Sequence, residues 1–285
     1  MIVAVIGTGT LGPAIAQVFS QSNTVDNVYL CKGRVSSINN GMESIIREFN
    51  KLIQKGKITK DYAEECISKI ITGEIENAKN ADLLIEAVSE NLEVKRSVFK
   101  KLDSICKKET VFATNTSSLP IQMIEEGLSR PLIGMHFFNP APIMKLVEVI
   151  VTDRTPVEII EKVMTVAKII GKTPVEVREA PGFIVNRVLI PMINEAIGIY
   201  AEGVASVEVI DTAMQLGANH PMGPLALGDL IGLDVVLDIL NVMLKGTGDN
   251  RYLPQPMLKR MVREKKLGRK TGQGFYLYNK EKEYD

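Results

Sequence analysis

The chain has 285 residues, 45% of them hydrophobic, which is enough for one large domain or two smaller ones. Its 34 basic and 34 acidic side chains cancel, so they create no strong field for nucleic acid or an anionic membrane. No apolar run has the roughly 20 residues of a membrane span, and a glycine motif follows the first strand too soon for a signal peptide. We therefore expect a cytoplasmic protein with three scattered, reduced cysteines and no metal site.

The N-terminal segment has the pattern of a dinucleotide-binding turn. A short apolar run predicts a buried strand, the sequence Gly-Thr-Gly-Thr-Leu-Gly follows it, and an apolar helical pattern comes next. Gly7 permits the tight turn, Gly9 lets the backbone approach a pyrophosphate, and Gly12 lets the helix pack closely on the strand. Thr10 and Leu11 lead into the helix, whose free N–H groups face the phosphates. The alternative is a structural turn without a ligand.

Later segments predict a parallel, doubly wound sheet in the same part of the chain. Strand-like runs occur at residues 2–6, 27–31, 69–72, 82–88, 110–114 and 131–138, with helical stretches such as 92–105 between most of them. A long, charged insert at about residues 35–68 separates the second and third strands. We interpret it as a solvated helical hairpin, or alternatively as a basic arm that meets an anionic ligand.

The end of the second strand departs from the usual dinucleotide fingerprint. An acid normally stands there and accepts hydrogen bonds from the adenosine ribose. This chain has Lys32 and Arg34 instead, and neither side chain can accept a hydrogen bond. Both can pair with a 2′-phosphate, which leaves NADP open as the cofactor beside NAD. The alternative is that the two cations are solvent-exposed and NAD binds through its phosphates alone.

Two short segments carry the candidate catalytic chemistry. His136, one of two histidines, lies near the end of a strand-like run, and Glu148 lies inside the β-branched run of residues 146–151. A lone carboxylate is costly to bury there unless it is hydrogen-bonded. A turn at Asn139-Pro140 can fold the second run back beside the first, and an imidazole held by a carboxylate is a general base. The alternatives are a packed core histidine and an ordinary carboxylate at a sheet edge.

Helical patterns dominate the second part of the chain. A helical run at 156–170 and a strand-like run at 173–177 precede Ala180-Pro181-Gly182, the best domain boundary. Helical patterns follow at residues 183–202, 207–216, 227–244 and 257–266. Their Ile, Met and Leu content is typical of a dimer face. The sequence thus predicts an α/β Rossmann-type domain, residues 1–180, followed by an all-α dimerisation and substrate domain, residues 181–285.

Seven motifs in this order give the chain a close resemblance to the L-3-hydroxyacyl-CoA dehydrogenase family, including its 3-hydroxybutyryl-CoA branch. The resemblance covers nearly the whole chain and is far more specific than any single motif. The motifs begin at residues 7, 85, 114, 136, 145, 181 and 268 and read GTGTLG, IEAVSEN, TNTSSL, HFFNP, KLVEVI, PGFIVNR and GRKTGQGF.

The resemblance implies an oxidoreductase that interconverts (S)-3-hydroxyacyl-CoA and 3-ketoacyl-CoA, with short acyl chains, by hydride transfer to or from NAD or NADP. His136 would then be the base, with Glu148 as its partner. Ser117 and Asn186 would hold the oxygen and the thioester end of the substrate. Residues near the cofactor would be Glu90, Lys95, Asn139 and Lys270. The family also implies a homodimer through the C-terminal domain, closure of the two domains around the substrate, and a helical arm near coenzyme A.

Several alternatives stay open at this point. A dehydrogenase of a free 3-hydroxy acid would lack a coenzyme A groove, so the basic arm distinguishes it from an acyl-CoA enzyme. A non-catalytic dinucleotide-binding protein would have lost the catalytic set, which is intact here. Ser117 and Ser118 can instead cap a helix that starts near Pro120, and Ser118 is the better candidate for such a cap. Lys32 stands where the family usually has an acid, so the choice of cofactor is open.

Overall fold

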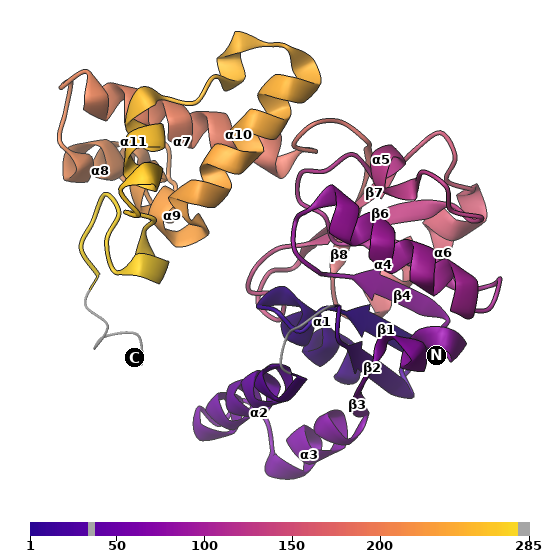
Figure 1. Cartoon of the computed structure of the whole chain (residues 1–285). Coiled ribbons are helices and arrows are strands. Elements are labelled where there is room, and N and C mark those ends of the chain that lie inside the picture. Colours follow the sequence, from indigo (N-terminus) through magenta and orange to yellow (C-terminus); the bar gives the residue numbers. More distant parts are fainter. Residues whose placement is uncertain (34–37, 279–285) are drawn as a thin grey trace. The chain divides into compact units, whose positions relative to one another are not determined.

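The computed structural model describes residues 1–33 and 38–278 and divides into two compact units, Met1–Ala180 and Pro181–Asp285 (Figure 1). Arg34, expected near the cofactor, lies outside the described residues. None of the helices in the described ranges is both long enough and apolar enough to cross a membrane.

The first unit contains an eight-stranded sheet with the order β3-β2-β1-β4-β5-β6-β7-β8. Its strands are β1 (Ile2–Ile6), β2 (Asn27–Cys31), β3 (Ile70–Gly73), β4 (Leu83–Glu86), β5 (Val111–Thr114), β6 (Leu132–Phe137), β7 (Leu146–Val151) and β8 (Thr173–Arg178). All neighbours are parallel except β6 and β7, which form an antiparallel pair. Central parallel strands are buried on both faces, which explains the continuous apolar runs in the sequence.

Helices connect these strands and cover the sheet. They are α1 (Leu11–Ser20), α2 (Ile38–Gln54), α3 (Lys60–Ser68), α4 (Leu92–Ile105), α5 (Ile121–Glu125), α6 (Val157–Ile169) and the short 3-10 helix η1 (Ile75–Asn80). Helices α2 and α3 form the hairpin expected between β2 and β3 and lie beside them at the sheet edge (Figure 1). The predicted Rossmann-type α/β class is confirmed.

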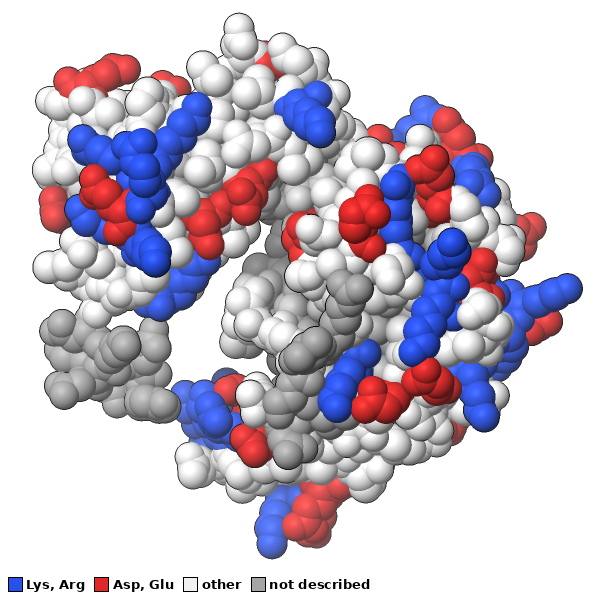
Figure 2. All heavy atoms as spheres, viewed as in Figure 1, with Lys and Arg blue, Asp and Glu red and all other residues white. Residues whose placement is uncertain are grey.

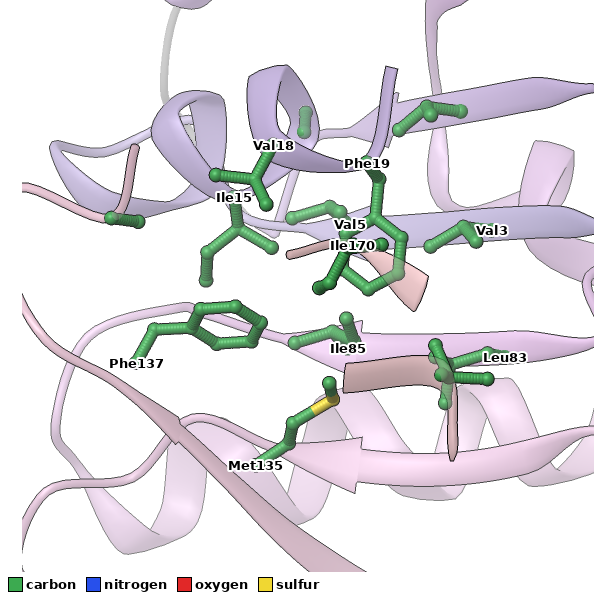
Figure 3. Packing of buried hydrophobic residues seen from close by; sticks show 14 of the residues in the cluster. Val3, Val5, Ile15, Val18, Phe19, Leu83, Ile85, Met135, Phe137 and Ile170 are labelled. Carbon is green, nitrogen blue, oxygen red and sulfur yellow. The ribbon is translucent and has the colours of Figure 1, made fainter. Parts of the chain in front are cut away.

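The core of this unit lies between the sheet and its helices. On one face, Phe19 of α1 meets Phe137 of β6 edge-to-face, with ring centroids 6.4 Å apart. Figure 3 shows these two rings with Val5 of β1 and Ile85 of β4 pointing into the same cluster. A second aromatic pair, 5.7 Å apart, joins α4 to β5 through Phe99 and Phe112. This packing fixes β4, β5 and β6, whose carboxyl ends carry the candidate site.

The second unit is helical, as expected. It consists of α7 (Val185–Ala201), α8 (Val207–Gly217), α9 (Pro224–Ile231), α10 (Leu233–Thr247), α11 (Pro256–Arg263) and the 3-10 helices η2 (Asn250–Tyr252) and η3 (Arg269–Thr271). The predicted single helix at 227–244 is wrong, because Gly232, with φ of +102°, separates α9 from α10. That backbone conformation is open mainly to glycine, so the chain turns there.

Candidate active site

The antiparallel pairing of β6 and β7 places His136 directly opposite Glu148. Nδ1 of the imidazole lies 2.8 Å from Oε2 of the carboxylate. The two residues are 4% and 0% exposed, so the pair is removed from bulk water. The expected turn does fold the second strand back beside the first, and the carboxylate reaches the ring.

This contact determines what the other ring nitrogen can do. An ionised carboxylate only accepts hydrogen bonds, so Glu148 requires a proton on Nδ1 of His136. In the neutral ring Nε2 then carries no proton and is the basic nitrogen, and it lies 3.1 Å from the hydroxyl oxygen of Ser117. The ring therefore presents a basic nitrogen next to a hydroxyl group, which is an arrangement suited to proton transfer.

Ser117 lies in a turn after β5 that is anchored by Glu90. Oε1 of Glu90 accepts hydrogen bonds from the backbone N–H groups of Ser117 and Ser118, each at 2.9 Å, and from the Thr116 hydroxyl at 2.7 Å. Burial opposes ionisation of this carboxyl, but the charge of Lys95 and the hydroxyl groups of Thr116 and Ser118 together lower its pKa. Glu90 thus holds the turn as a carboxylate.

The alternative reading of Ser118 as a helix cap is wrong. Its backbone N–H and its hydroxyl both donate to Glu90, the latter at 3.0 Å. Helix α5 starts after Pro120 without a side-chain cap. The two serines of this turn are therefore held by one carboxylate.

A buried ion pair lies behind Glu90. Lys95 of α4 is 1% exposed, and its Nζ is 2.8 and 3.1 Å from the carboxylate oxygens of Glu86, which is 0% exposed. The same Nζ is 3.2 Å from Glu90. Glu86 also accepts from the Thr114 hydroxyl at 2.6 Å, so each charge has several polar partners. Sequence reasoning did not single out Glu86; its position at the end of β4, inside an apolar run, was the available signal.

The glycine turn has the shape that a pyrophosphate requires. A Cβ on Gly7 would lie 2.4 Å from the carbonyl oxygen of Ala87, and one on Gly12 would lie 1.9 Å from that of Gly7. A Cβ on Gly9 would meet nothing within 4 Å, so the backbone there borders open space. Thr10, the N-cap of α1, makes no side-chain capping bond to the first N–H groups of the helix. These features fit a bound dinucleotide.

The loop after β6 carries Asn139, whose side chain is exposed. The backbone of this loop is hydrogen-bonded to Lys172, a residue that the sequence analysis did not identify. Nζ of Lys172 donates to the carbonyl oxygens of Ala141 and Met144, at 2.5 and 2.9 Å. Burial lowers the pKa of this lysine. The free-energy cost of burying this ammonium group is offset by the two hydrogen bonds, which fix the loop next to His136.

Two expected site residues belong to the second unit. Asn186 lies in the first turn of α7 and is buried, at 9% exposure. Lys270 lies in η3, where its Nζ is 2.5 Å from a carboxylate oxygen of Asp234. Their approach to the substrate and the cofactor stays a prediction.

Comparison with known proteins places this geometry in a family. Residues 2–180 match the 3-hydroxyacyl-CoA dehydrogenase NAD binding domain, and residues 182–278 match the C-terminal domain of the same enzymes. The chain belongs to the 3-hydroxyacyl-CoA dehydrogenase family. This agrees with the resemblance that the motifs gave and makes the chain an oxidoreductase with a nicotinamide dinucleotide domain.

Full-length relatives support the assignment. The chain is 52% identical over 283 residues to a 3-hydroxybutyryl-CoA dehydrogenase of Clostridioides difficile, covering 98% of this chain and 100% of the relative. It is 42% identical to the human mitochondrial hydroxyacyl-coenzyme A dehydrogenase, with 97% and 90% covered. The crystal structure of (S)-3-hydroxybutyryl-CoA dehydrogenase PaaH1 from Ralstonia eutropha matches with a TM-score of 0.92 and 39% identity, covering 98% and 99% of the two chains.

The buried ion pair generates a stability prediction. Lys95→Met should lower the free energy of unfolding by about 3–5 kcal/mol, because it leaves the Glu86 charge buried without a cation. Urea unfolding followed by circular dichroism measures the change, and Lys100→Met, on the exposed side of the same helix, is the control. Adding Glu86→Gln to Lys95→Met should recover part of the loss. A loss of less than about 1 kcal/mol in the free energy of unfolding of Lys95→Met would show that the ion pair does not stabilise this part of the fold.

Proposed function

We propose that the chain catalyses the reversible oxidation of short-chain (S)-3-hydroxyacyl-CoA to 3-ketoacyl-CoA, such as 3-hydroxybutyryl-CoA to acetoacetyl-CoA. His136 is the general base and acid of this reaction. The observation that carries the proposal is the imidazole held at Nδ1 by Glu148, with Nε2 beside the Ser117 hydroxyl. The names of the full-length relatives support the choice of substrate.

Oxidation of a secondary alcohol requires a proton to leave oxygen while a hydride leaves carbon. The nicotinamide, when bound, accepts the hydride. Nε2 of His136 takes the proton, since the unprotonated nitrogen of a neutral imidazole is a base. Glu148 keeps the ring in the required tautomer and stabilises the imidazolium that forms.

The reverse reaction uses the same groups. Protonated His136 donates from Nε2 to the developing alkoxide, while the Ser117 hydroxyl supplies a hydrogen bond to the same oxygen. Asn186, from the second unit, holds the thioester end of the substrate in this proposal. Because Glu90 fixes the turn that carries Ser117, this hydroxyl needs little rearrangement when charge develops.

The remaining assignments concern cofactor and partners. Glu90, Lys95, Asn139 and Lys270 contribute to the cofactor site beside the glycine turn, and Lys32 leaves NADP acceptable as well as NAD. The arm formed by α2 and α3 receives coenzyme A, to which exposed cations such as Arg47 and Lys55 are suited. The protein works as a cytoplasmic homodimer joined through residues 181–285, with neither nucleic acid nor membrane as a partner and no metal.

The test is a substrate and cofactor matrix followed by absorbance at the reduced-nicotinamide band. NADH and NADPH are each combined with acetoacetyl-CoA, a long-chain 3-ketoacyl-CoA and free acetoacetate. We expect rapid oxidation of the reduced nicotinamide with acetoacetyl-CoA and little oxidation with free acetoacetate. Turnover of free acetoacetate alone would replace the proposal by a free-acid dehydrogenase, and no turnover with any substrate would favour a non-catalytic dinucleotide-binding protein.

Substitution of the pair tests the mechanism. His136→Gln should lower kcat by about a hundredfold or more, the usual contribution of a general base. Glu148→Gln should lower it nearly as much, because the two side chains act as one unit. His220→Gln, at the only other histidine, is the matched control and should keep normal turnover. If either variant of the pair retains wild-type kcat, the role assigned to that residue is wrong.

A further inference from the structure

The ends of β2 and β3 carry a charged pair at the ligand-binding edge of the sheet. The two strands are parallel, with Cys31 opposite Gly73, and the next residues are Lys32 and Glu74. Nζ of Lys32 lies 3.2 Å from Oε1 of Glu74. In open sheets of this kind, ligands bind beyond the carboxyl ends of the strands. The pair therefore lies at the edge of the sheet where a dinucleotide is expected.

Backbone contacts connect this pair to the glycine turn. The carbonyl of Cys31 accepts from the Gly7 N–H at 2.9 Å, and the Lys32 N–H donates to the Gly73 carbonyl at 3.1 Å. A Cβ on Gly33 would lie 3.8 Å from the Cα of Gly7. The chain after β2 thus runs directly beside the first glycine of the turn. This is where the fingerprint places the adenosine ribose.

Stability does not explain the pair. Its side chains are 36% and 64% exposed, and exposed ion pairs contribute little to folding. The neighbouring acid, Glu76, pairs instead with Lys101 of α4 at 2.6 Å. Glu74 is therefore the acid of this segment that lies next to Lys32 and the ribose position, and its exposure leaves its carboxylate accessible to a ligand.

We infer that Glu74, at the end of β3, supplies the carboxylate that the fingerprint normally has at the end of β2, and that it decides between NAD and NADP. This rests on the proposed dinucleotide-dependent function. An ionised carboxylate accepts hydrogen bonds from ribose hydroxyls and repels a 2′-phosphate. Lys32 has the opposite preference, but it is partly neutralised by Glu74. The pair as a whole favours NAD over NADP. The Lys32 cation keeps this preference small.

The test measures dissociation constants of NADH and NADPH for the full-length protein without acyl-CoA, by reduced-nicotinamide fluorescence. The wild type should bind NADH about tenfold more tightly than NADPH, a difference typical of one charge-assisted hydrogen bond. Glu74→Gln should weaken NADH binding and strengthen NADPH binding, so that the preference is lost or reversed. Lys32→Gln should increase the preference for NADH by about tenfold, because it removes the cation that attracts the phosphate.

Glu76→Gln is the matched control, since it changes an acid on the same segment that has a lysine partner elsewhere. It should leave both dissociation constants unchanged. Three results would overturn the inference: a wild type that prefers NADPH, an unchanged ratio in Glu74→Gln, or equal weakening of both cofactors in that variant. Failure of the wild type to bind either cofactor would instead reject the proposed function, on which the inference rests.

Discussion

The hydrogen bond between His136 and Glu148 is the constraint on which the candidate site depends. Both residues are buried, so each polar group needs the other as a partner. The bond also depends on the register of β6 and β7, because a shift by one residue would turn the carboxylate to the opposite face of the sheet. The antiparallel pairing of β6 and β7, inside an otherwise parallel sheet, therefore places the carboxylate that makes Nε2 of His136 the basic nitrogen.

A second polar network brings the hydroxyl group to that nitrogen. It starts at Glu86 on β4, passes through Lys95 on α4 to Glu90, and ends at the turn that carries Ser117. Lys172 fixes the other loop next to His136, the one after β6, by hydrogen bonds to its carbonyl oxygens. Buried networks of this kind are costly when incomplete, so the same contacts that position the reacting groups also limit alternative arrangements.

Much of this architecture could be predicted from local patterns. Apolar β-branched runs identified the strands, and the glycine turn identified the ligand edge, because both depend on short segments of the chain. The single helix expected at 227–244 was wrong because its apolar periodicity continues through Gly232, whose backbone conformation ends α9. Periodicity does not report such a change of backbone direction.

Partners that are distant in the sequence could not be predicted in the same way. Glu74 meets Lys32 across two neighbouring strands, and Lys172 meets the carbonyl of Ala141 from the turn between α6 and β8. Neither contact has a spacing or motif that indicates it. His136 and Glu148 were an exception, since a lone carboxylate in a short apolar strand, close to a histidine and a turn, indicates a partner by its cost alone.

The protonation state of the His136 ring tests the account most directly. The chain has only two histidines, so long-range proton–nitrogen correlation spectra of protein labelled with ¹⁵N-histidine give two imidazole patterns, and His220→Gln assigns them. The neutral His136 ring should carry its proton on Nδ1, where Glu148 accepts it, with Nε2 unprotonated. A neutral ring protonated on Nε2 would contradict the account, because its basic nitrogen would then face the carboxylate and not the substrate.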